Sequence, residues 1–163
     1  MPGVRPITHC TSNVSAFSAD PFELSRFADA QSSSYSDALD ELKAGQKRSH
    51  WMWFIFPQVA GLGSSAMARR YAIGSRAEAE AYLAHPVLGE RLRMCVEALL
   101  EVEGRSAEQI MGYPDFMKLQ SSMTLFAEIS PAGSSFEQLL KKYYGGRKDP
   151  KTLEFLAQHI KSA

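Results

Sequence analysis

The sequence of 163 residues predicts an all-α protein, a single compact multi-helix domain of about eight helices. Two observations predict this fold class. Apolar side chains recur at helical spacing through most of the chain, and Ser, Asp, Pro and Gly stand where helices start or stop. No segment shows the sustained alternation of apolar and polar residues that is typical of strands. A chain of this length is expected to form one domain with a substantial core.

The first half of the chain contains several of these helical patterns. "DPFELSRFADA" begins with Asp20 as a predicted N-cap and Pro21 at the first helical position. "SYSDALDELKAG" carries an apolar face and ends at Gly45, a favourable residue after a helix. "SSAMARRYAIG" predicts a short helix capped by Ser64 or Ser65.

The second half continues in the same way. "SRAEAEAYLAH" has Ser75 as a cap and Glu78 three residues later, which is the pattern of a capping box. Pro86 opens the longest predicted helix, which ends at Gly104, and His85 before it is expected to organise the junction. "SAEQIMG" predicts another short helix, capped by Ser106. The remaining helices are predicted in "PDFMKLQSSMTLFAEI", "SSFEQLLKKYYGG" and "DPKTLEFLAQHI".

Composition limits the classes of function. Lys plus Arg equals Asp plus Glu at 18 each, so no overall field favours nucleic acid or an acidic membrane, and no nucleic-acid partner is expected. The longest apolar run, residues 51–56, is far shorter than the roughly 20 residues that span a bilayer. Two cysteines, Cys10 and Cys95, are expected to be free thiols, which favours a cytoplasmic location. Residues 1–19 lack a secretory signal and are expected to be a disordered tail before a globular domain at 20–163.

The segment "KRSHWMWFIFPQVAGLGSS" contains the strongest candidate for a binding site. The run from Trp51 to Phe56 is apolar on all sides, so it is predicted to be buried, as a helix or as a short central strand. The helix is favoured because the chain offers no second strand that could satisfy the backbone of the first. Pro57 ends the run.

This segment is either core with polar ends or a pocket with aromatic walls. In the second interpretation Trp51, Trp53 and Tyr71 stack against a planar ligand. Basic and polar side chains that could hold its charged groups flank the aromatic run: Lys47, Arg48 and Gln58. His50 is the candidate general acid–base residue because its pKa lies nearest neutrality.

The turn after the aromatic run could add backbone donors to such a pocket. Gly61 and Gly63 permit close approach of the backbone, and Ser64 precedes a predicted helix start. A simple turn followed by a helix cap is the alternative, since the pattern lacks a third glycine or the Gly-Lys-Ser/Thr of an ATP-binding loop.

A second polar cluster lies in "MKLQSSMTLF", where Lys118, Ser121 and Ser122 share one helix face. These residues could form a serine–lysine nucleophile pair or hold an anionic ligand. Alternatively, the hydroxyl groups bond back to carbonyls one turn earlier in a packed helix. If the aromatic segment is a pocket, we expect His50 and one of Lys47 and Arg48 to converge with this cluster, because buried polar groups need partners.

The blocks "DPFELSRFADAQ", "KRSHWMWFIFPQVAGLGSS", "RRYAIGS", "AYLAHPVLGERL", "MKLQSSMTLF" and "YYGGRKDPKTLEFL" resemble the domain-of-unknown-function family numbered 1810. Its members are small bacterial and plant proteins that are sometimes labelled calpastatin. The resemblance runs from about Asp20 to Leu156 and implies a compact all-α domain, but no established activity. The calpastatin label does not fit, because such an inhibitor would be a long, disordered, repetitive chain.

Two hypotheses of function follow from these patterns. In the first, the protein binds a small phosphorylated or nucleotide-like ligand in a pocket, either as an enzyme or as a binding protein. The second is a protein–protein interaction module without catalytic activity. No Cys/His/Asp cluster has the spacing of a metal site, and the sequence names neither a cofactor nor an oligomeric state. A closed, polar pocket would favour the first hypothesis, and a flat apolar patch would favour the second.

Overall fold

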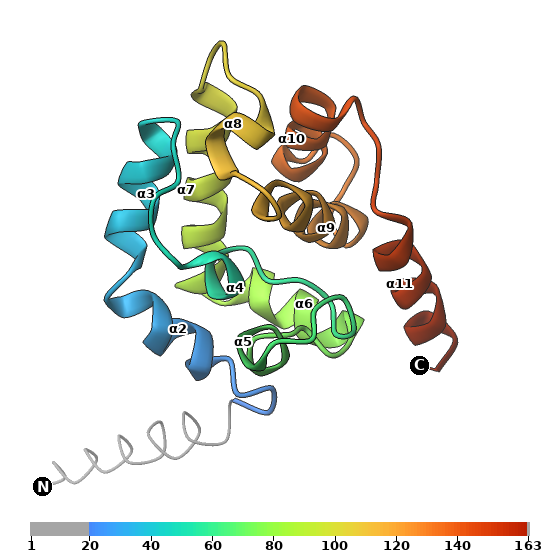
Figure 1. Ribbon diagram of the computed structural model, residues 1–163. Helices are drawn as coiled ribbons and strands as arrows, with labels where there is room; N and C mark the ends of the chain where they lie inside the picture. Colours follow the sequence, from blue (N-terminus) through green and yellow to red (C-terminus); the bar gives the residue numbers. More distant parts are fainter. Residues whose placement is uncertain (1–19, 163) are drawn as a thin grey trace, which may run out of the picture.

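The computed structural model of the protein describes residues 20–162. The predicted N-terminal tail, residues 1–19, lies outside the described residues. Within residues 20–162 the chain forms ten helices, labelled as in Figure 1: α2 (Ser25–Ser32), α3 (Tyr35–Lys43), α4 (Met52–Ile55), α5 (Ala66–Arg70), α6 (Arg76–Ala84), α7 (Leu88–Glu101), α8 (Ala107–Met111), α9 (Asp115–Glu128), α10 (Ser135–Tyr144) and α11 (Pro150–Ser162).

The all-α prediction is confirmed, but the described residues contain ten helices instead of about eight. Three of them, α4, α5 and α8, are single turns of four or five residues. Such short helices are marginal by themselves and form here because the surrounding structure supports them. Within the described residues the only strand-like pairing is an isolated parallel bridge between Val59 and Ile73.

Helices α7 and α9 lie at the centre of the molecule (Figure 1). Helix α7 packs against α3, α6 and α10, and α9 packs against α6, α8, α10 and α11. Apolar residues three or four positions apart on these two helices are fully buried: Leu92, Val96 and Leu99 on α7, and Leu119, Met123 and Phe126 on α9. The apolar faces that the sequence predicted are therefore the faces that form the core.

The aromatic run between α3 and α5 is buried, as predicted. All of its residues are buried except Trp53, which is half-buried at the edge of the core. The favoured helix is also confirmed, although α4 covers only Met52–Ile55. After Pro57 the chain is extended, and the Ile73 N–H donates to the Gln58 carbonyl at 2.8 Å. The loop at residues 58–62 is thereby held against the α5–α6 connection.

Several predicted helix caps are observed. Ser65 caps α5 and Ser75 caps α6, each through a hydrogen bond from the backbone N–H three residues later. Ser106 and Gln109 form a complete capping box at α8. His85 organises the start of α7, because its Nδ1 accepts hydrogen bonds from the N–H groups of Val87 and Leu88, both at 3.1 Å.

The predicted start of the first helix is wrong. Helix α2 begins at Ser25 instead of Pro21. The Asp20 carboxylate accepts the N–H groups of Leu24 and Ser25, and Glu23 has a positive φ of 54°, so a separate turn precedes the helix. The capping box predicted at Ser75 is also incomplete, because the Glu78 carboxylate accepts the Gly74 N–H and pairs with Arg26 instead.

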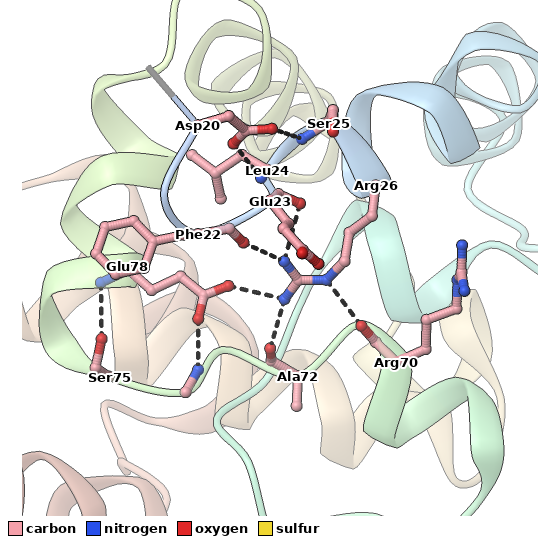
Figure 2. A network of polar contacts seen from close by, with 11 residues as sticks. Asp20, Phe22, Glu23, Leu24, Ser25, Arg26, Arg70, Ala72, Ser75 and Glu78 are labelled. Carbon is pink, nitrogen blue, oxygen red and sulfur yellow. Dashed lines mark hydrogen bonds and ion pairs between the residues drawn. The ribbon is translucent and has the colours of Figure 1, made fainter. Parts of the chain in front are cut away.

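Figure 2 shows how Arg26 ties the N-terminal turn to the connection between α5 and α6. Its guanidinium lies 2.8 Å from the Glu78 carboxylate and donates to four backbone carbonyls, those of Phe22, Glu23, Arg70 and Ala72. Arginine suits this position because its planar group presents five N–H donors in fixed directions. These contacts satisfy the guanidinium, so we interpret this network as structural.

Candidate functional site

One lysine from each of the two polar clusters predicted from the sequence contacts Asp115. The Lys47 ammonium lies 2.9 Å from Oδ2 of Asp115, and the Lys118 ammonium lies 3.6 Å from Oδ1. Each lysine also lies over an indole ring, Lys47 over Trp51 at 4.8 Å and Lys118 over Trp53 at 5.4 Å. Charge and cation–π contacts through these two lysines therefore join the start of α9 to Trp51 and Trp53 of the aromatic segment.

Asp115 was not singled out from the sequence. It occupies the first turn of α9, where a negative charge also interacts favourably with the helix dipole. That position is visible in the sequence, but the ion pair with Lys47 is not, because it depends on how the loop before α4 meets α9.

A cleft of about 290 Å³ opens beside this cluster. Its walls come from the loop after α4, from α9 and from the first turn of α11 (their places are shown in Figure 1). The polar residues that line it are Gln58, Lys118, Ser121, Asp149 and Lys151. Three of these, Gln58, Lys118 and Ser121, are candidates from the sequence, and the fold brings them to one cleft from two distant segments.

Ser121 is engaged with Asp149 rather than with Lys118. Its hydroxyl lies 3.0 Å from Oδ2 of Asp149 and 3.3 Å from the Met117 carbonyl one turn earlier. Asp149 in turn accepts the N–H and the hydroxyl of Thr152 and so caps α11. The described contacts therefore do not include the hydrogen bond that a Ser121–Lys118 nucleophile pair would need.

Two buried polar atoms near this region have no hydrogen-bond partner among the described residues. They are Nε1 of Trp53 and Oγ of Ser122. Ser122 is fully buried on α9, so its side chain lies in the helix packing rather than in the open cleft. An unpaired buried hydroxyl or indole N–H costs about 1–3 kcal/mol.

The loop before α4 is organised by Glu41, a residue that sequence reasoning missed. Its carboxylate accepts the N–H groups of Arg48 and Ser49, the Ser49 hydroxyl and the indole N–H of Trp51. Burial by itself would raise the pKa of Glu41. These hydrogen bonds outweigh burial and lower the pKa to about 2, and the bond from the Ser49 hydroxyl has the largest lowering effect. Trp51 thus finds the partner that a buried indole requires.

Other predicted site residues lie apart from the cleft. Arg48 and His50 are exposed, and none of the described contacts joins either side chain to Lys118 or Ser121. Trp51 and Tyr71 are core residues, and the Tyr71 ring packs against Phe54 with ring centroids 5.4 Å apart. Of the three predicted aromatic walls, Trp53 alone lies beside a cleft-lining residue, Lys118.

The glycine-serine turn contributes less than the sequence suggested. Gly61, Gly63 and Ser64 are exposed, and Ser65 is the residue that caps α5. Gly61 has a φ of +96°, a conformation that favours glycine, and it lies in the loop that borders the cleft. Helix α5 has only five residues, so its start offers a weak dipole for an anion.

Residues 20–162 contain no group of three or more His, Cys, Asp or Glu side chains placed to hold a metal ion. In the same part of the chain, no helix combines the length and the apolar character needed to cross a membrane.

Comparison with known proteins shows the family. The family described as "Protein of unknown function (DUF1810)" matches residues 21–156, and the chain belongs to it. A solved structure, that of the conserved hypothetical protein Rv1873 from Mycobacterium tuberculosis, is similar, with 54% sequence identity and a TM-score of 0.83. The alignment covers 85% of this chain and 99% of that protein. No curated protein matches the chain.

Proposed function

We propose that the protein binds a small anionic ligand, phosphorylated or nucleotide-like, in the cleft lined by Gln58, Lys118, Ser121, Asp149 and Lys151. The observation that carries this proposal is the convergence of two lysines and three hydrogen-bonding side chains on one cleft. Pockets for small molecules typically combine apolar walls with a few convergent polar groups. Here Met117 and Leu62 supply apolar wall beside the polar side chains.

The charges around the cleft favour an anion. Lys118 and Lys151 contribute two positive charges, and Asp149 contributes one negative charge. The charge of Asp115 is matched by Lys47, whose side chain is only 8% exposed and lies closer to Asp115 than Lys118 does. The cleft therefore has a net positive charge of one, which a phosphate or carboxylate group would neutralise.

Lys118 is the residue that is best placed to bind the anion. Its side chain is 27% exposed, and its distance of 3.6 Å from Asp115 exceeds that of a strong charge-assisted hydrogen bond. When Lys118 turns toward a ligand, Asp115 keeps its contact with Lys47, so no buried charge is left unpaired. The Trp53 ring lies under the Lys118 ammonium and forms a cation–π contact with it.

Binding is better supported than catalysis. His50 remains the candidate for acid–base chemistry, and its exposed side chain lies outside the cleft lining. We also propose a cytoplasmic location, which is supported by the buried free thiol of Cys95.

An interaction module is the second candidate function, and one observation favours it. Tyr113 is 74% exposed in the turn before α9, and Met117 is 49% exposed in the first turn of α9. Large apolar side chains that are exposed, such as these, are typical of contact surfaces. In that case Tyr113→Ser should weaken a partner's binding and leave the affinity for small anions unchanged.

The test of ligand binding is isothermal titration calorimetry with ribose 5-phosphate. We expect saturable binding that weakens as salt is raised, and at least a tenfold loss of affinity in Lys118→Gln. Lys141→Gln, an exposed lysine on α10 away from the cleft, is the matched control and should bind as the wild type does. Absence of binding to wild-type protein, or equal affinity in the Lys118 and Lys141 variants, would refute the proposal.

A further inference from the structure

A second groove continues from the proposed anion cleft along α11. Its volume is about 370 Å³, and Leu62 and Lys151 line both spaces, so the two are adjacent. The α11 residues that line the second groove are Lys151, Glu154, Phe155 and Gln158. This spacing of three, four and seven residues places them on one face of the helix. One face of α11 therefore runs from the anion cleft to the far end of the second groove.

The second groove differs in chemistry from the first. Phe155 and Leu62, both half-buried, give it some apolar surface among a mainly polar lining. Beyond Lys151 it contains no further cation among its described lining residues, and it contains one carboxylate, that of Glu154. A carboxylate accepts hydrogen bonds only, so this groove suits an uncharged ring that carries N–H donors. A second phosphate would be repelled by Glu154.

The dimensions of the two spaces support a single ligand that occupies both. The cleft near Lys118, at about 290 Å³, lies just below the roughly 300–1,000 Å³ of typical small-molecule sites. With the adjoining groove of about 370 Å³, the combined space falls within that range. The seven residues from Lys151 to Gln158 correspond to about 10 Å along the helix axis, enough for an anionic group, a sugar and a ring in sequence.

We infer that the ligand of this site is a nucleoside monophosphate. Its phosphate binds Lys118 and Lys151, its sugar lies near Leu62, and its base packs on Phe155 and donates to Glu154. This inference rests on the proposed function and adds the ring-binding half of the site. Gly61 also lines this groove, and a Cβ at this position would have no atom within 4 Å.

The test compares AMP with ribose 5-phosphate, which lacks the base. Calorimetric titration of the wild-type protein should show AMP binding at least tenfold tighter than ribose 5-phosphate. Glu154→Gln should lower the affinity for AMP about tenfold and change that for ribose 5-phosphate less than twofold. Glu154 is exposed, so this variant is expected to fold, and Glu97→Gln on α7 is the matched control.

The outcomes separate the two proposals. If ribose 5-phosphate binds through Lys118, but AMP binds no tighter or Glu154→Gln has no effect on AMP, the nucleotide inference is wrong and the anion site stands. If neither compound binds the wild-type protein, both proposals are refuted. Tighter binding of AMP that is lost selectively in Glu154→Gln supports both.

Discussion

Replacing Glu41 with glutamine removes the negative charge that holds the loop between α3 and α4. The Glu41 carboxylate accepts hydrogen bonds from two backbone N–H groups, from the Ser49 hydroxyl and from Nε1 of Trp51, at distances between 2.5 and 3.0 Å. A glutamine side chain offers one oxygen acceptor and turns its NH₂ group toward the remaining donors. The loop that carries Lys47 to the aromatic segment should therefore become less stable.

The pKa of Glu41 sets the size of this effect. A pKa lowered from its ordinary value of 4.5 to about 2 corresponds to about 3 kcal/mol, at about 1.36 kcal/mol for each pH unit. Because the side chain is only half-buried, solvent screens the interaction, and we expect a loss of about 1–2 kcal/mol at pH 7. Asp40→Asn, an exposed acid on the same helix, should change stability by less than about 0.5 kcal/mol.

The pH dependence provides a check that a packing defect would not reproduce. The folded state lowers the pKa of Glu41, so its contribution is complete above the unfolded pKa of 4.5 and is lost as the pH falls toward 2. In urea titrations followed by tryptophan fluorescence, the difference between wild type and Glu41→Gln should shrink by more than half from pH 7 to pH 3. A difference that stays constant over this range would refute the electrostatic explanation.

Three further predictions concern the core. Trp51→Ala should lower the free energy of unfolding by about 3–5 kcal/mol, because Trp51 is only 1% exposed. Trp53→Ala, at a half-buried position, should lower it by about 1–3 kcal/mol. Denaturant titration of both variants measures these losses, and a larger loss for Trp53→Ala would contradict the prediction. Gly89→Ala should cost at least about 1–3 kcal/mol and lower the melting temperature, because a Cβ there would lie 2.1 Å from a backbone carbonyl oxygen of α6. In the Cys10→Ser variant, the Cys95 thiol should not react with Ellman's reagent at pH 8 until the protein unfolds, because burial raises its pKa to about 12. Rapid reaction of the native protein would contradict this prediction and show that the surroundings of Cys95 open.

Much of the fold could be predicted from the sequence because its signals are local. The apolar faces of the two central helices were visible as repeats of three and four residues. The caps at Ser65 and Ser106, and the role of His85, depend on atoms within three residues of each other in the chain. Where a distant side chain competed, as Arg26 does for Glu78, the local rule predicted the wrong partner.

The candidate site was predictable only in part. Lys118 and Ser121 were identified from their shared helix face, and Gln58 from its place after the aromatic run. The sequence does not show that Asp149 and Lys151 join them, or that Trp51 and Tyr71 belong to the core. Helix periodicity predicts which side chains share a face of a helix, but it does not predict which other helix or loop that face will contact.

The sequence by itself determined that this chain forms helices, where most of them end, which faces are buried and which family the chain resembles. The tertiary structure alone decided that Lys47 and Lys118 share Asp115, that Glu41 binds Trp51, and that α11 borders the cleft. The physical reason is the range of the interactions. Periodicity and capping act over a few residues, whereas these contacts join distant segments and exist only after the helices have packed.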